Sequence, residues 1–146
     1  MASIREQILA AFFAELKTLE TASIKLQRNP DKAVKIPDGG AIITFRDGDS
    51  GEPEVLLSPT RYIYDHSASV EIMINNAFAE RQQLSLDDLL VIIGNLIENN
   101  RTMDGLAEWV EALAPEINQE AIEGAPAMRA ATVTVQFRFS TTNPLL

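Results

Sequence analysis

The sequence predicts an α+β fold, a mostly antiparallel β-sheet with two main helices packed on one face. Two long stretches, Tyr62–Asn75 and Ala130–Ser140, alternate apolar and polar residues. Strict alternation indicates strands with one face on a core, and strands whose other face is polar are usually antiparallel. Two further stretches, near residues 4–20 and 86–99, repeat apolar residues at helical spacing. We therefore expect a single domain, residues 1–146, with the helices covering the apolar side of the sheet.

The N-terminal segment predicts a helix that begins with a capping box. Ser3 takes the N-cap position and Glu6 the third helical position, where each side chain can bond to the backbone N–H of the other residue. Apolar residues then share one face to about residue 20: Ile4, Ile8, Leu9, Phe12, Phe13, Leu16 and Leu19. Because the polar face is mixed rather than basic, we interpret this helix as packing on the sheet and not on a membrane.

The middle of the chain predicts short strands separated by turns. Ile24–Gln27 alternates and is stopped at Asn29–Asp31, which contains a proline. Ala41–Arg46 is rich in β-forming residues. Segment 47–53 has turn composition, so we expect it to join Ala41–Arg46 to Glu54–Leu57 as a hairpin. Tyr62–Asn75 then forms a long strand whose even-numbered residues face the core.

The second half of the chain predicts another helix and the final strand. Ser85–Asp88 repeats the capping signal, and the helix should end near residue 100. The sequence leaves open whether residues 77–84 form an earlier turn of that helix. Gly105–Leu113 is compatible with a short strand or a helical turn. Residues 114–126 contain two prolines and a glycine, so we expect them to be mostly irregular.

Composition excludes several functional classes. The absence of cysteine rules out disulfides, thiolate metal sites and thiol nucleophiles, and fits a reducing cytoplasm. Neither a secretory signal pattern nor an apolar run of about 18 residues occurs, so we expect no membrane-spanning helix. Residues 1–46 carry a charge of +2 and residues 47–146 a charge of −11. An acidic surface binds DNA poorly, but it suits a passage through which DNA slides.

The chain offers little for catalysis. Asp65, His66 and Ser67 are the residue types of a hydrolase triad, but on a strand His66 points away from the other two. We interpret His66, the only histidine, as a core residue with a bonded ring nitrogen. The carboxylates of segment 47–54 invite a calcium interpretation, but an EF-hand loop needs glycine sixth and glutamate twelfth, where this chain has Glu52 and Ser58. We therefore favour a solvated acidic hairpin tip, and expect no enzyme, metal or cofactor.

The candidate functional residues are those of a subunit interface. They comprise a basic group, an acidic group and the chain's last residues: Lys25, Arg28, Lys32 and Lys35; Asp47, Asp49, Glu52 and Glu54; and Pro144, Leu145 and Leu146. The simplest interpretation of the basic group is a solvated rim. The alternative is a contact with the acidic part of another copy, because a protomer with unlike ends can stack head to tail and close into a ring.

The last residues pose a separate question. Leu145 and Leu146 follow Pro144, which disfavours continuation of a central strand. The two leucines either fold back onto the sheet or bind to a neighbouring subunit. We expect the neighbour.

Several segments together resemble the small tail-completion or tail-terminator proteins of long-tailed bacteriophages and prophages, the minor-tail-protein-U-like group. The segments that carry the resemblance are 46–54, 57–59, 62–66, 101–106, 109–111, 123–125 and the Thr-Asn-Pro at 142–144. Proteins of that group form a ring, typically a hexamer, that caps the tail tube, ends its polymerisation and provides the head-joining surface.

The resemblance therefore implies a structural virion protein. Its partners would be further copies of itself, the tail tube protein and a head–tail connector, and DNA would pass through without sequence-specific binding. The protein would be found in the phage tail, and in the host cytoplasm during assembly. One alternative is another connector or neck protein. A weaker one is a small enzyme, because some similar prophage chains are described as acyl-CoA transferases. The chain offers no thiol or phosphate cradle for that chemistry.

Overall fold

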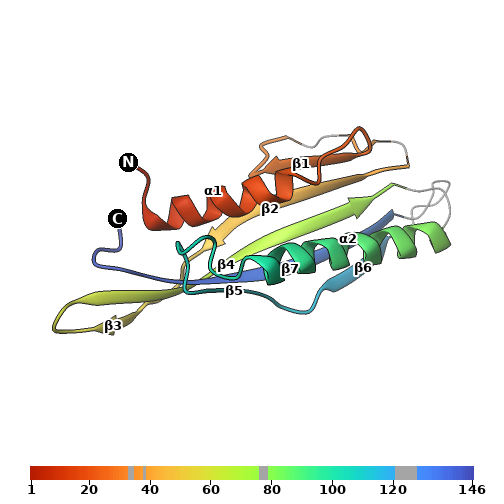
Figure 1. Ribbon diagram of the computed structural model, residues 1–146. Helices are drawn as coiled ribbons and strands as arrows, with labels where there is room; N and C mark the ends of the chain where they lie inside the picture. Colours follow the sequence, from red (N-terminus) through yellow and green to blue (C-terminus); the bar gives the residue numbers. More distant parts are fainter. Residues whose placement is uncertain (33–34, 38, 76–78, 121–127) are drawn as a thin grey trace.

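A twisted sheet carries two helices on one face (Figure 1). The computed structural model describes residues 1–32, 35–37, 39–75, 79–120 and 128–146. Its helices are α1 (Ile4–Lys17) and α2 (Ala79–Asn99). Its strands are β1 (Ile24–Arg28), β2 (Ala41–Asp49), β3 (Glu54–Leu56), β4 (Arg61–Ile74), β5 (Trp109–Ala112), β6 (Glu116–Glu120) and β7 (Met128–Thr141). The predicted α+β class is confirmed.

Strands β4 and β7 form the centre of the sheet. They pair antiparallel along nearly their whole length, from Tyr62 opposite Thr141 to Ile74 opposite Arg129. The order across the sheet is β1-β2-β4-β7-β5, with β3 also on β4 and β6 also on β7. Only the β1–β2 pair is parallel among the strand pairs of the described residues. The sheet is thus mostly antiparallel, as the alternation of its two long strands predicted.

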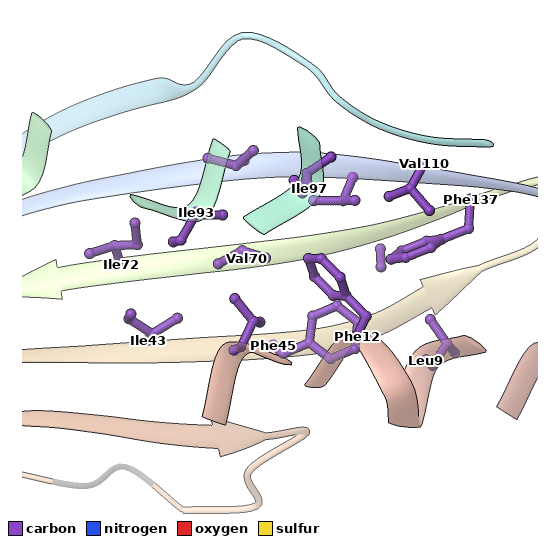
Figure 2. Packing of buried hydrophobic residues seen from close by; sticks show 14 of the residues in the cluster. Leu9, Phe12, Ile43, Phe45, Val70, Ile72, Ile93, Ile97, Val110 and Phe137 are labelled. Carbon is purple, nitrogen blue, oxygen red and sulfur yellow. The ribbon is translucent and has the colours of Figure 1, made fainter. Parts of the chain in front are cut away.

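The core lies between the sheet and both helices (Figure 2). Alternate residues of β4 and β7, such as Val70 and Phe137, are fully buried. Phe12 of α1 lies at the centre, with its ring centroid 5.4 Å from that of Phe45 and 5.1 Å from that of Phe137. Helix α2 adds Ile93 and other residues to the same core. Neither helix covers the opposite face of the sheet.

Helix α1 begins as predicted but uses only half of the capping box. The Ser3 hydroxyl accepts from the backbone N–H of Glu6 at 3.2 Å. The Glu6 carboxylate accepts instead from Arg28 of β1 at 2.9 and 3.0 Å. The first turn of the helix is therefore tied to the first strand.

The predicted hairpin between β2 and β3 is wrong. Both strands pair with the same edge of β4, so the chain continues along that edge instead of reversing. The register of β2 shifts between Arg46 and Asp49, and Gly48 lies there with φ of +70°. A Cβ at Gly48 would stand 1.9 Å from the carbonyl oxygen of Ser67. The glycine-rich segment thus forms a bulge and a bend, and the reversal falls at residues 57–60.

The second half differs from expectation in two places. Helix α2 begins at Ala79 and not at Ser85, so the earlier turn that the sequence left open is helical from Ala79, while residues 77 and 78 lie outside the described residues. Residues 116–120, expected to be irregular, form β6 on β7. Residues 121–127 lie outside the described part. Trp109–Ala112 takes the strand alternative.

Side chains bond to the backbone of the two outermost strands of the β1-β2-β4-β7-β5 path. On β1, the N–H of Leu26 donates to the Glu20 carboxylate at 3.1 Å. On β5, the carbonyl of Val110 accepts from the Arg101 guanidinium at 3.0 Å, and that guanidinium also lies 4.9 Å from the centre of the Trp109 ring. In each of these strands, a side chain therefore already bonds to one backbone group that would otherwise be free to pair with a further strand.

Candidate assembly surfaces

The predicted basic group divides into a bonded arginine and three exposed lysines. Arg28 donates to both carboxylate oxygens of Asp47, at 2.8 and 3.0 Å, and to both of Glu6. Hydrogen bonds to Asp47 first, and to Glu6, raise the pKa of Arg28 above its ordinary value. Partial burial raises the pKa of Asp47, but the hydrogen bonds from Arg28 and Asn29, together with the positive charge of Arg28, lower it by more, so the pKa lies below its ordinary value. Arg28 and Asp47 thus satisfy each other within one protomer.

The lysines Lys32 and Lys35 border a groove on the outer face of the sheet. The groove has a volume of about 650 Å³. Its apolar lining is Ile36, Ile42 and Met73, and its charged lining adds Asp31, Arg46 and Glu71 to the two lysines. Arg46 pairs with Glu71 at 3.2 Å across β2 and β4. We call this site the outer-face groove; the third lysine, Lys25, is exposed on neighbouring β1 and does not line it.

The predicted acidic group lies along the bend between β2 and β3. Asp49 accepts from the backbone N–H of Gly51 at 3.0 Å and so stabilises the bend itself. Glu54 lies 3.6 Å from Arg138 of β7, which also pairs with Asp65 and Glu108. Glu52 is exposed. Within the described part of the chain, no group of three or more acidic or histidine side chains is arranged to hold a metal ion.

An exposed apolar hairpin is a candidate functional feature that was not identified from the sequence. It consists of β3, the turn at 57–60 and the start of β4 through Ile63, and we call it the arm. Figure 1 shows the arm extending past the ends of both helices. Val55, Leu56 and Leu57 are all exposed, Leu57 by 77%. The sequence feature that indicates the arm is this apolar run beside Ser58-Pro59, which we interpret from the sequence alone as a strand paired with Ala41–Arg46.

The chain's last residues form a turn that leaves their leucines exposed. The buried Thr141 hydroxyl lies within hydrogen-bond distance of the carbonyls of Asn143 and Leu146, at 2.9 and 3.2 Å. The Asn143 side chain accepts from the N–H of Leu145 at 2.9 Å. Leu145 is nevertheless 83% exposed and Leu146 59%. Together with Pro144 between them, these contacts fix the backbone of the tail without burying its apolar side chains.

The leucines and residues of both chain ends line a second hollow of about 320 Å³. Its lining includes Met1, Ile4 and Arg61. Arg61 begins β4, and therefore belongs to the arm. The tail and the arm thus lie at the same end of the protomer (Figure 1).

His66 is buried, as predicted, and both of its ring nitrogens are bonded. Its Nδ1 lies 2.7 Å from the Ser50 hydroxyl oxygen, and its Nε2 bonds to the carbonyl of Asp47. Burial lowers the pKa of His66 below its ordinary value, so the ring is neutral at pH 7. A neutral ring that donates from Nε2 to the carbonyl accepts from Ser50 at Nδ1. Asp65 is exposed on the other face, so the predicted separation of the three triad-like residues is also confirmed.

No protein-family model matches this sequence, and a search of curated proteins finds no significant relative. Among the described residues, neither helix has the length and apolar character needed to cross a membrane.

Proposed function

We propose that this protein is a structural component of a phage tail, and that it closes the tail tube by forming a ring of identical subunits. The observation that carries the proposal is a protomer with a complete core whose apolar arm and tail remain exposed. Burying one leucine side chain contributes about 1.5–3 kcal/mol. Burial of Leu57, Leu145 and Leu146 against another subunit would therefore contribute free energy of association that the isolated protomer does not gain.

The distribution of these surfaces favours a ring over a closed dimer. The arm and the tail lie at one end of the sheet, and the outer-face groove lies at the other, where β1, β2 and the end of β4 meet. Contacts between unlike ends are heterologous, and a heterologous contact that closes produces a cyclic oligomer. A hexamer is the ring size that the resemblance implies.

The assignment to a phage tail rests on the resemblance, and the placement of its segments agrees with a role in assembly. Segments 46–54 and 57–59 form the bend and the tip of the arm, while 142–144 opens the tail. The partners would be the tail tube protein on one side of the ring and a head–tail connector on the other. The formal charge of −9 suits a lumen through which DNA moves without binding.

Two measurements test the proposal. Sedimentation velocity across a range of protein concentrations should reveal a ring-sized species, and negative-stain images of the protein with purified tail tubes should show a ring at the tube end. High salt should weaken the ring if charged contacts contribute to it. Strictly monomeric protein at high concentration, together with bare tube ends, would count against the proposal.

A further inference from the structure

We infer that the arm of one protomer binds in the outer-face groove of the next, which assigns the contact that closes the ring. The inference rests on the proposed ring and goes beyond it by naming the two surfaces. The occupant of the outer-face groove is a second copy of this chain.

The two surfaces lie at opposite ends of one strand. The arm includes Arg61–Ile63 at the start of β4, and the groove includes Glu71 and Met73 near its end. At 3.2–3.4 Å per residue these positions are roughly 30 Å apart. A single protomer therefore cannot place its own arm in its own groove. Successive copies can do so in the same orientation, which is the arrangement that a cyclic oligomer requires.

The apolar parts of the two surfaces match. The arm presents Leu56, which is 47% exposed, and Leu57, which is 77% exposed. The groove presents Met73, which is 41% exposed, beside the buried Ile42, its partner across β2 and β4. Apolar area on both sides would leave water on association, which is the main favourable contribution to most protein interfaces.

Exposed charges of opposite sign lie beside the apolar parts, although the groove lining also contains Asp31 and an Arg46–Glu71 pair, and Glu54 lies 3.6 Å from Arg138. Glu52 and Glu54 precede the arm's apolar run and are exposed, and Lys32 and Lys35 line the groove and are exposed. Opposite charges at the border of an apolar contact speed association and fix its orientation. The same pairing disfavours contact of two arms or of two grooves, because like charges would then meet. Complementarity thus selects the head-to-tail arrangement.

Three variants test the contact. The arm variant is Leu56→Asp with Leu57→Asp, and the groove variant is Lys32→Glu with Lys35→Glu and Met73→Asp. All five positions are exposed, so each variant should fold, which circular dichroism and thermal unfolding would verify. The matched control is Val91→Asp, which places a charge on an apolar residue of α2 that is 55% exposed and lines neither surface.

Each interface variant alone should lose the ring-sized species, with self-association weakened by about tenfold or more, since a charge would meet an apolar or like-charged surface. The control should assemble like the wild type. A mixture of the two variants retains one intact contact, between the arm of the groove variant and the groove of the arm variant. The mixture should therefore form 1:1 dimers and nothing larger, as measured by light scattering coupled to gel filtration.

The outcomes separate this contact from the ring itself. Wild-type rings together with monomeric variants and 1:1 dimers in the mixture would support the arm-to-groove contact. Rings that persist in either variant would overturn the contact and leave the ring proposal standing. Rings lost in the variants but no dimers in the mixture would also overturn it, because the two surfaces then do not meet. Wild-type protein that never forms rings, alone or on tail tubes, would remove the proposed function and this contact with it.

Discussion

Arg28 binds Asp47 through two parallel hydrogen bonds, although 19 residues separate them in the chain. The pair joins the end of β1 to β2, and Glu6 extends it to the first turn of α1. Side chains that the sequence suggested for two different subunits thus meet inside one. Of the predicted interface charges, Lys25, Lys32, Lys35 and Glu52 are exposed, whereas Glu54 is exposed but lies 3.6 Å from Arg138 of its own chain.

Replacing Asp47 by asparagine should lower the free energy of unfolding by about 1–2 kcal/mol at pH 7, because the charged hydrogen bonds to Arg28 are weakened. The pKa of Asp47 is lowered in the folded protein, so its contribution is present above the unfolded-state pKa of about 3.9. That contribution is lost as the pH falls through the lower, folded value.

Urea unfolding of both proteins at pH 7 and near pH 3 measures the effect. The difference between wild type and Asp47→Asn should shrink at the lower pH. The exposed Glu98→Gln on α2 is the control, and should change stability little at either pH. A pH-independent difference for Asp47→Asn would mean that the carboxylate charge is not what stabilises the cluster.

His66 should make the protein less stable in mild acid. Its pKa is lowered by burial, so below about pH 6.5 the unfolded chain binds a proton that the folded chain does not. Stability should fall as the pH drops from about 6.5 toward the folded pKa, by at most about 1.4 kcal/mol per pH unit. His66→Gln should flatten the unfolding free energy over this range, and an unchanged slope would show that another group titrates there.

His66→Ala should leave assembly intact. The ring nitrogens are bonded to Ser50 and to the Asp47 carbonyl, so the substitution removes structural contacts only. We expect a stability loss of about 1–3 kcal/mol and normal capping of tail tubes per folded molecule. A variant that folds well but loses a measurable turnover would revive an enzymatic interpretation.

Deleting residues 143–146 should separate stability from assembly. Because Leu145 and Leu146 are mostly exposed, the thermal unfolding midpoint should change by only a degree or two, whereas ring formation or tube capping should weaken. Differential scanning calorimetry and sedimentation would measure both effects. If the truncated protein had an unfolding midpoint several degrees lower and yet assembled normally, the tail would stabilise the protomer and not the interface.

Phe12→Ala should be the most destabilising of these changes, at about 3–5 kcal/mol, because its ring fills the space between Phe45 and Phe137. Phe13→Ala, at a half-buried position on the same helix, should cost clearly less. Chemical denaturation of the two variants gives the comparison. Equal losses would contradict the packing described for the centre of the core.

The sequence predicted those parts of the fold that a local pattern of adjacent residues determines. Alternation in Tyr62–Asn75 predicted both β4 and its buried face, and Ser3 predicted the start of α1. The β2–β3 hairpin was wrong because the composition of a tight turn also suits a bulge, and only the approach of Gly48 to the Ser67 carbonyl decides between them. Strand β6 was missed because backbone pairing with β7 holds a segment without marked alternation.

The candidate site was less predictable than the fold. The pairing of Arg28 with Asp47 depends on the parallel register of β1 and β2, which no local pattern encodes. The exposure of Leu56 and Leu57 likewise depends on where the helices end, and not on the residues themselves. The tail was easier to identify, because Pro144 followed by two leucines indicated from the sequence alone that apolar residues lie outside a central strand.

The bonded groups on the outer strands bear on solubility before assembly. β-Sheet edges that expose free backbone groups can pair with one another and stack into fibres as the protein concentration rises. Here the Glu20 side chain bonds to the Leu26 N–H of β1 and the Arg101 side chain to the Val110 carbonyl of β5, so each of these edges offers one free backbone group fewer. The pKa of Glu20 is lowered by its hydrogen bonds to Lys17 and to the Leu26 N–H, so its carboxylate stays ionised to a lower pH than that of a free glutamate. Neither β1 nor β5 therefore presents an unbroken row of free backbone groups to a further strand.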